Sequence, residues 1–264
     1  YNYNNWYHFG DNKISDFKTP KLLGIKAKLH SISKFNKYET AIVSHLNCYD
    51  AYLVSTLFAR FRKTMESDLD YFSFSYISLY MVPYVSWLLK DALKKNIKTL
   101  YFVSRDGYLL KSVADAIIKK KKYKIKTRYF YGSRKAWRVA SYIDVVDEEF
   151  FSLFGDLVGV KNYSQLLQAL HLDDDKFKEL FPDLIEYVNL KRYDKKDLAV
   201  IIEVIKKRQE YHNYLLSVSK KLRETVNAYL KQEINNSENY AFVEYWARGY
   251  TQDCLTRLLK DTFG

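Results

Sequence analysis

The fold of this chain is decided by the stretch Phe242–Gln252, which reads FVEYWARGYTQ. Its pattern predicts a strand over residues 240–245, followed by a short turn that contains Arg248 and Gly249. A helix is expected from Thr251 to Lys260. In α/β proteins the order strand, glycine-containing turn, helix directs backbone N–H groups and a helix N-terminus at an anion. The stretch therefore predicts an anion-binding turn.

The same order of elements occurs earlier in the chain. Residues 99–104 (TLYFVS) predict a buried strand, Arg105–Asp106–Gly107 a turn, and residues 108–119 a helix. A further strand is expected over residues 126–132 and ends at Ser133–Arg134. Strands joined by helices run parallel, and ligands of open parallel sheets bind beyond the carboxyl ends of the strands. We therefore expect the three turns to converge on one site.

These patterns predict an α/β protein with a parallel, Rossmann-like sheet. The pattern between the second and third strands is helical over about 136–234, including one long helix over 195–230, so we expect a large helical insertion there. The whole α/β domain is expected over 67–264. A linker and one helix are expected over 32–66.

The composition favours an anionic partner. The net charge is +12 over 264 residues, and a basic surface attracts phosphorylated substrates, anionic lipid or nucleic acid. Nucleic acid is the least expected of these, because the chain has no zinc-finger, helix-turn-helix or RNA-binding signature. The two cysteines, Cys48 and Cys254, form neither a disulfide framework nor a zinc pattern, which favours the cytoplasm.

One segment raises the question of a membrane. Residues 71–89 contain no charged side chain, and that length is enough to span a bilayer. The tyrosines and serines in its first half and Pro83 favour a buried amphipathic helix instead. A peripheral contact with an anionic membrane is a further alternative, because the basic charge of the chain would support it.

The three turns carry the side chains and glycines that phosphate recognition uses. Arginine binds phosphate oxygens in a bidentate manner, and glycine allows the backbone to approach a ligand closely. Asp106 and Glu244 are the candidate catalytic acids or bases, and carboxylates also suit Mg²⁺. The alternative is that Arg105 and Asp106 form a helix-capping ion pair and that Arg248 is a surface side chain. The candidate substrate- and phosphate-binding residues are Arg105, Gly107, Ser133, Arg134, Arg248, Gly249, Tyr250, Thr251 and Gln252.

Residues 1–31 carry a different motif. Gly10–Asp11, followed by Asp16 and then by KLLGIKA (residues 21–27), resembles the fourth motif of the haloacid dehalogenase (HAD) superfamily. The resemblance implies that Asp11 and Asp16 help to hold Mg²⁺; the alternative is a plain Asx-type loop. The candidate for the family's Asp-x-Asp nucleophile motif is Asp68–Leu69–Asp70, and no hydrophobic strand precedes it. We therefore expect the tail of a HAD domain without its nucleophile.

From about residue 71 onward, the chain resembles a domain that is commonly fused behind HAD-like domains in bacterial surface-polysaccharide loci. The apolar helix, Leu100–Leu110 (LYFVSRDGYLL), Tyr131–Arg134 (YGSR) and the pair Gly249 and Gln252 carry this resemblance. Relatives often have Asp-x-Gly-Trp where this chain has Glu244–Ala247. The resemblance implies a glycan-assembly enzyme, and some such fusions pair a phosphoribosyl-type transferase with a phosphatase.

Three hypotheses of function follow. The first is a glycosyl- or phosphoribosyl-transferase that uses Mg²⁺, a phosphorylated sugar donor and a glycan acceptor in capsule or O-antigen assembly. The second is a HAD-type phosphohydrolase whose nucleophile domain is missing from this chain. The third is a non-catalytic basic scaffold that docks partner glycosyltransferases or the membrane. Each places the chain in the bacterial cytoplasm, either free or at the inner face of the membrane.

Overall fold

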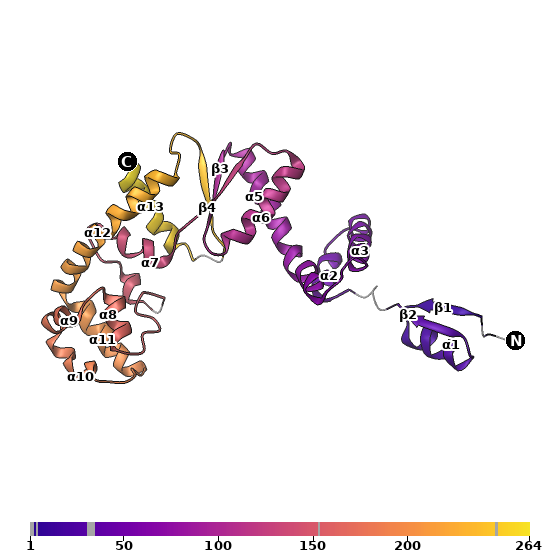
Figure 1. Ribbon diagram of the computed structural model, residues 1–264, viewed down its shortest axis with the longest axis horizontal. Coiled ribbons are helices and arrows are strands. Elements are labelled where there is room, and N and C mark those ends of the chain that lie inside the picture. The colour runs from indigo at the N-terminus through magenta and orange to yellow at the C-terminus, as the bar shows by residue number, and fades with distance from the viewer. Residues whose placement is uncertain (1–2, 4, 31–34, 153, 246–247) are drawn as a thin grey trace. The chain divides into compact units, whose positions relative to one another are not determined.

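The computed structural model describes residues 3, 5–30, 35–152, 154–245 and 248–264 (Figure 1). The chain is a mixed α/β protein that forms two compact units, Tyr1–Leu89 and Lys90–Gly264. The division falls within helix α5 (Leu79–Lys94). The predicted boundary at residue 67 stays a prediction.

The first unit contains a two-stranded parallel sheet and several short helices. Strand β1 (Tyr7–Gly10) pairs with β2 (Lys26–Leu29). Glu39 and Arg62 form a buried ion pair, with 2.5 Å between Oε2 and Nη1, that joins two of the helices. The helical segments of this unit are η1 (Lys13–Lys18), α1 (Thr19–Leu22), α2 (Lys37–Ser44), α3 (Cys48–Arg62), α4 (Asp68–Phe72), η3 (Ser73–Ser78) and the first part of α5.

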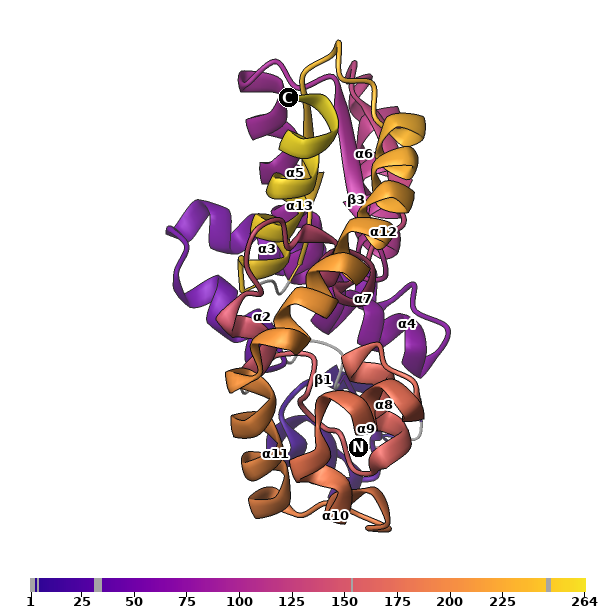
Figure 2. The same cartoon turned by 90° about the vertical axis from the view of Figure 1, so that its left-hand side faces the viewer.

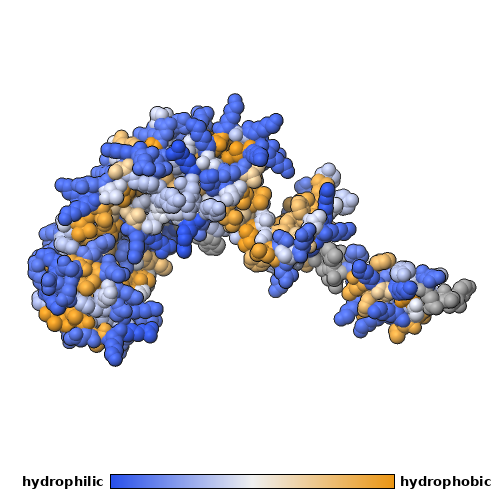
Figure 3. All heavy atoms as spheres, in the orientation of Figure 1, coloured by the Kyte–Doolittle hydropathy of each residue, from blue (hydrophilic) through white to orange (hydrophobic). Residues whose placement is uncertain are grey.

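The continuous helical stretch Asp68–Lys94 is long and apolar enough to cross a membrane, with a mean hydropathy of 1.2. The helix expected over 71–89 is not buried as predicted, because only 17% of its most apolar window is buried and most of its other residues are half-buried or exposed. Phe72 and Trp87 are among the apolar side chains at its surface. Figure 3 shows apolar surface in this part of the chain.

The second unit is built on the three-stranded parallel sheet that the sequence predicts. The strand order is β4 (Lys126–Phe130), β3 (Thr99–Val103), β5 (Tyr240–Val243), so that β3 lies in the centre and is buried along its whole length. Both neighbours run parallel to β3. Strand β5 ends two residues before the predicted end, at Val243.

Helices cover both faces of this sheet (Figure 1). Helix α6 (Gly107–Lys121) packs on β3 and β4 and buries Leu110 and Ala114. The other face carries Tyr101 and Phe130, which share a core with residues of α12 (Gln209–Glu233) and α13 (Tyr250–Phe263). Helices α6 and α13 begin at the turns that follow β3 and β5.

The predicted helical insertion is present and has a hydrophobic core of its own. The long helix expected over 195–230 is interrupted at Arg208, whose backbone is extended and whose guanidinium contacts Asp183. Helix α12 contributes Leu215 to the core of the insertion and Leu230 to the core of the sheet, so it joins the two (Figure 2). The other elements of the insertion are α7 (Arg134–Trp137), η4 (Val139–Ser141), η5 (Glu148–Phe151), α8 (Tyr163–Leu170), α9 (Asp174–Leu180), η6 (Pro182–Leu184), α10 (Ile185–Val188) and α11 (Lys195–Lys207).

Candidate functional site

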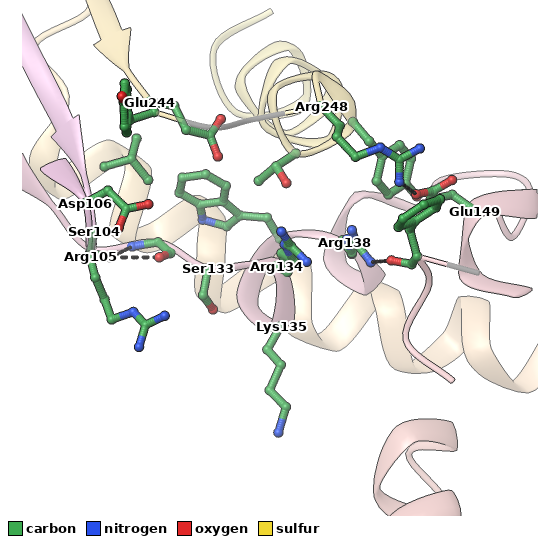
Figure 4. Close-up of a pocket in the computed structure, with 17 residues that line it drawn as sticks. Ser104, Arg105, Asp106, Ser133, Arg134, Lys135, Arg138, Glu149, Glu244 and Arg248 are labelled. Carbon is green, nitrogen blue, oxygen red and sulfur yellow. Dashed lines mark hydrogen bonds and ion pairs between the residues drawn. The ribbon is translucent and has the colours of Figure 1, made fainter. Parts of the chain in front are cut away.

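The turns after β3, β4 and β5 line one pocket of about 740 Å³, which we call the strand-end pocket (Figure 4). The predicted convergence of the three turns is therefore present in the described residues. Five basic side chains and three carboxylates line this pocket, which leaves it with an excess of positive charge. The predicted site residues that line it are Arg105, Asp106, Ser133, Arg134, Glu244, Arg248, Tyr250 and Thr251.

A pair of hydrogen bonds fixes the ends of β3 and β4 to each other. The Ser104 hydroxyl donates to the carbonyl of Gly132 at 2.7 Å and accepts from the Gly132 N–H at 3.0 Å. The Ser104 N–H also donates to the carbonyl of Phe130 at 2.9 Å. These bonds extend the pairing of the two strands beyond their last ladder positions and hold the first two turns side by side.

Two glycines of these turns are needed for packing. A Cβ atom on Gly107 would lie 2.6 Å from the backbone carbonyl carbon of Phe102, and one on Gly132 would lie 1.8 Å from the ring of Trp137. Gly107 is buried and is not among the residues that line the strand-end pocket. Gly107 therefore allows close contact between the start of α6 and β3, and its role at a ligand stays a prediction.

Asp106 and Glu244 bring two carboxylates from adjacent strand ends to one side of the pocket (Figure 4). Asp106 is the N-cap residue of α6, but its side chain makes no capping hydrogen bond. The alternative of a helix-capping ion pair with Arg105 is therefore absent among the described residues. Burial and the nearby Asp106 raise the pKa of Glu244, whereas a hydrogen bond from Gln252 and the charge of Arg134 oppose this rise. A cation between the two carboxylates would relieve their repulsion.

Ser133 and Arg134 begin the short helix α7. The Ser133 hydroxyl accepts from the N–H of Ala136 at 3.2 Å, so it caps this helix. The Arg134 side chain is exposed at the pocket and acts electrostatically on Glu244. The position of Arg134 therefore suits an anion held against the ends of β4 and β5.

Arg248 approaches the pocket from the turn after β5, and the insertion holds it there. Its Nη1 lies 3.6 Å from Oε1 of Glu149, and its guanidinium lies 3.7 Å from the ring centroid of Phe154. The Arg248 side chain is still 58% exposed, so it can also reach a ligand. Trp246 and Ala247 of the same turn lie outside the described residues.

Gly249 has a backbone φ of +90°, a conformation that side-chain-bearing residues rarely adopt, and it sits at the start of α13. Tyr250 contributes its ring to the pocket, but its hydroxyl donates to Oδ2 of Asp147 at 2.6 Å. Thr251 lines the pocket in the first turn of α13, and Gln252 supports Glu244 from outside it. The N-terminus of α13 thus opens into the strand-end pocket.

Two basic residues of the site were missed by the sequence reasoning. Lys135 lines the pocket, as does Arg138, whose side chain is only 6% exposed. Arg138 donates from Nη1 to the carbonyl of Phe154 at 2.9 Å and lies over the ring of Tyr250, while its Nε has no partner among the described residues. The i, i+4 spacing of Arg134 and Arg138 was a usable signal, because it places both on one helical face.

The two acids predicted to bind Mg²⁺ in the first unit follow β1, with Asp11 between β1 and η1 and Asp16 within η1. Asp16 accepts from the N–H of Asn12 at 2.9 Å and lies 3.1 Å from Nε2 of His8; these contacts lower the pKa of Asp16. The Asp11 side chain is exposed. Within the described ranges, no group of three or more His, Cys, Asp or Glu is placed to hold a metal. The role of Asp11 and Asp16 stays a prediction.

Comparison of the chain with models of known protein families gives no match, and comparison with curated proteins finds no relative.

Proposed function

We propose that the second unit is a transferase domain of Rossmann-like architecture that binds a phosphorylated sugar donor in the strand-end pocket. The observation that carries this proposal is the convergence of basic side chains from three parallel strand ends on one pocket. Phosphorylated ligands bind at this edge of open parallel sheets, and the N-terminus of α13 opens there as well. The resemblance to domains of surface-polysaccharide loci leads us to place the reaction in capsule or O-antigen assembly in the bacterial cytoplasm.

In this proposal the arginines hold the phosphate groups of the donor. Arg134 and Arg248 come from different turns, so together they can clamp an anion from two sides. The buried Arg138 adds a charge that water screens little. As the bond between the sugar and its phosphate breaks, negative charge grows on the departing phosphate. Fixed cations stabilise that charge more in the transition state than in the bound donor.

Asp106 and Glu244 are the proposed partners of Mg²⁺. Two carboxylates on one side of a phosphate pocket are the oxygen donors that Mg²⁺ prefers, and Mg²⁺ commonly keeps several waters while it bridges to phosphate. The ion would neutralise phosphate charge when bound. As the alternative to metal binding, Glu244, whose pKa is raised by burial, is the candidate acceptor for the proton of the attacking hydroxyl.

The first unit is proposed to be the tail of a HAD-like domain, on the strength of the motif around Asp11 and Asp16. In a longer protein such a domain would remove a phosphate after transfer. The change Asp11→Asn should then abolish phosphate release by the longer protein and leave donor binding by the second unit unchanged.

The test is the melting temperature of this chain with Mg²⁺ and either phosphoribosyl pyrophosphate or one of a panel of nucleotide sugars. A donor at about 100 times its dissociation constant stabilises the folded state by about 2.7 kcal/mol. We expect such a shift with one donor and its loss in Arg248→Ala. Arg192→Ala, an exposed arginine outside the strand-end pocket, is the matched control and should keep the shift. A chain that no donor stabilises, or that a donor stabilises equally in Arg248→Ala, would overturn the proposal.

A further inference from the structure

A second pocket of about 450 Å³ lies beside the strand-end pocket, within the same unit. Lys135 lines both pockets. Asp156, which lines the second pocket, has its Oδ1 3.8 Å from Nη1 of Arg138, which lines the first. The two pockets are therefore neighbours that share a wall made by α7 and the segment after it.

The second pocket differs from the first in its chemistry. Its polar side chains are Lys135, Asp156, Gln165, Gln168 and His171, so the pocket contains one lysine and one carboxylate. Burial and the charge of Lys135 lower the pKa of His171, which favours the neutral form of its ring. This pocket therefore lacks the excess of positive charge that an anion would need.

The polar groups of the second pocket are arranged as hydrogen-bond partners for hydroxyls. Gln165 accepts from the N–H of Lys161 at 2.9 Å, which leaves its amide NH₂ able to donate. The side-chain amide of Gln168 makes no hydrogen bond with the described residues and can both donate and accept. A neutral imidazole likewise offers one donor and one acceptor. Amides, a neutral ring and a carboxylate together match the alternating donors and acceptors of a saccharide.

Asp156 carries the strongest indication of a ligand. Its Oδ2 is buried and has no hydrogen-bond partner among the described residues, and burial raises the pKa of this carboxyl. A buried polar atom without a partner is costly, and Asp156 lines the second pocket, so a ligand hydroxyl that bonded to this carboxyl would be favourable. The remaining wall is formed by small apolar residues such as Val160 and Ala169, against which the carbon skeleton of a sugar can pack.

We propose that the second pocket binds the acceptor of the transfer reaction, a neutral saccharide whose hydroxyls bond to Asp156, Gln165 and Gln168. This inference rests on the proposed function, which places the anionic donor in the adjacent strand-end pocket. The shared wall at Lys135 would bring an acceptor hydroxyl close to the donor phosphate without placing two anions together.

The experiment is saturation-transfer NMR on the full chain with the methyl glycosides of glucose, galactose and N-acetylglucosamine. We expect at least one glycoside to bind with a dissociation constant of about 1–10 mM, and Gln168→Ala and Asp156→Asn each to weaken it by about tenfold. Gln232→Ala, an exposed glutamine on α12, is the matched control and should bind as the parent chain does. The thermal melt of each variant establishes that it is folded.

Pyrophosphate binding, measured by calorimetry on the same variants, separates this inference from the proposed function. Gln168→Ala should leave pyrophosphate binding unchanged, whereas Arg248→Ala should weaken it. If no glycoside binds, or if binding is equal in Gln168→Ala and Gln232→Ala, the acceptor pocket is wrong even where pyrophosphate binds normally. If a glycoside binds and Gln168→Ala weakens it while pyrophosphate does not bind, the saccharide site stands and the assignment of the donor fails.

Discussion

Ser104 and Gly132 exchange two hydrogen bonds across the ends of β3 and β4, one from the Ser104 hydroxyl at 2.7 Å and one to it at 3.0 Å. A serine side chain here does what a backbone group does within a sheet, because it both donates to and accepts from one residue of the neighbouring strand end. The turns that carry Asp106 and Arg134 begin directly after these two residues. The relative position of these two turns therefore depends on the hydrogen bonds between Ser104 and Gly132.

Replacement of Ser104 by alanine should therefore destabilise the fold and disturb the relative position of the two turns. The change leaves the N–H and the carbonyl of Gly132 without their partner, which should lower the free energy of unfolding by about 1–3 kcal/mol. Ser112→Ala, which removes an exposed helix hydroxyl that bonds to the carbonyl of Tyr108, is the control and should cost less than about 0.5 kcal/mol. Urea melts of the two variants measure the difference, and equal midpoints would show that the pair is not structural.

The strand-end pocket was predictable from sequence because its signals are local. The run TLYFV predicts a short buried strand, and the turn Arg105–Gly107 begins one residue after it. Topology then brings this turn to the same edge as Arg134 and Arg248. The positions of the strand ends required no knowledge of side-chain packing.

The other half of the pocket could not be predicted in this way. Glu149 and Phe154 come from the insertion, far from Arg248 in sequence, and they meet it only because α12 ties the insertion to the sheet. Tyr250 was expected to bind phosphate, yet its hydroxyl bonds to Asp147, a contact between residues about a hundred positions apart. Such pairs depend on tertiary packing, which no local pattern encodes.

Gly249 should be needed for its backbone conformation alone. Its φ is +90°, and a Cβ atom built on it would meet nothing within 4 Å. Gly249→Ala should thus cost about 1–2 kcal/mol of unfolding free energy through backbone strain, without a steric clash. Gly107→Ala should cost more, because its Cβ would collide with the backbone of Phe102. Thermal melts rank the two, and a smaller loss in Gly107→Ala than in Gly249→Ala would contradict this account.

Asp147 should stabilise the second unit in a pH-dependent way. It accepts two hydrogen bonds from Arg257, at 3.0 and 2.6 Å, as well as one from Tyr250. Burial alone would raise the pKa of Asp147, but these bonds outweigh it and hold the pKa below its usual value. A lowered pKa contributes stability that is present above the unfolded-state pKa of about 3.9 and is lost as the pH falls through the folded-state pKa.

The variant Asp147→Asn should accordingly be less stable than the parent chain at pH 7, by about 1.5–3 kcal/mol, the usual worth of hydrogen bonds to charged groups. The difference should shrink as the pH falls below about 4. Asp144→Asn, at an exposed position of the same segment, should melt with the parent chain throughout. A constant difference between Asp147→Asn and the parent chain from neutral to acid pH would exclude the charged interaction.

Glu244 should make the stability of the second unit depend on pH in the opposite direction from Asp147. Its pKa is raised, so the folded state favours the protonated carboxyl, and this stability is present below the unfolded-state pKa of about 4.3 and lost as the pH rises through the folded-state pKa. Glu244→Gln should match the parent chain near pH 4 and exceed it in melting temperature near pH 8. Mg²⁺ should stabilise the parent chain at pH 8 and have a smaller effect on the variant. A variant that is less stable than the parent at pH 8 would reverse the sign and refute the prediction.

Glu149 should restrain Arg248 and weaken the binding of anions. The carboxylate lies 3.6 Å from the guanidinium and adds negative charge to a pocket that we propose receives phosphate. Glu149→Gln keeps the shape and removes the charge, so pyrophosphate should bind more tightly by about 0.5–1 kcal/mol, roughly two- to fivefold. Glu148→Gln, at the neighbouring exposed position outside the pocket, should change the affinity less. Calorimetric titration of both variants decides the matter: weaker binding in Glu149→Gln would mean that the carboxylate positions Arg248 for the ligand instead of competing with it.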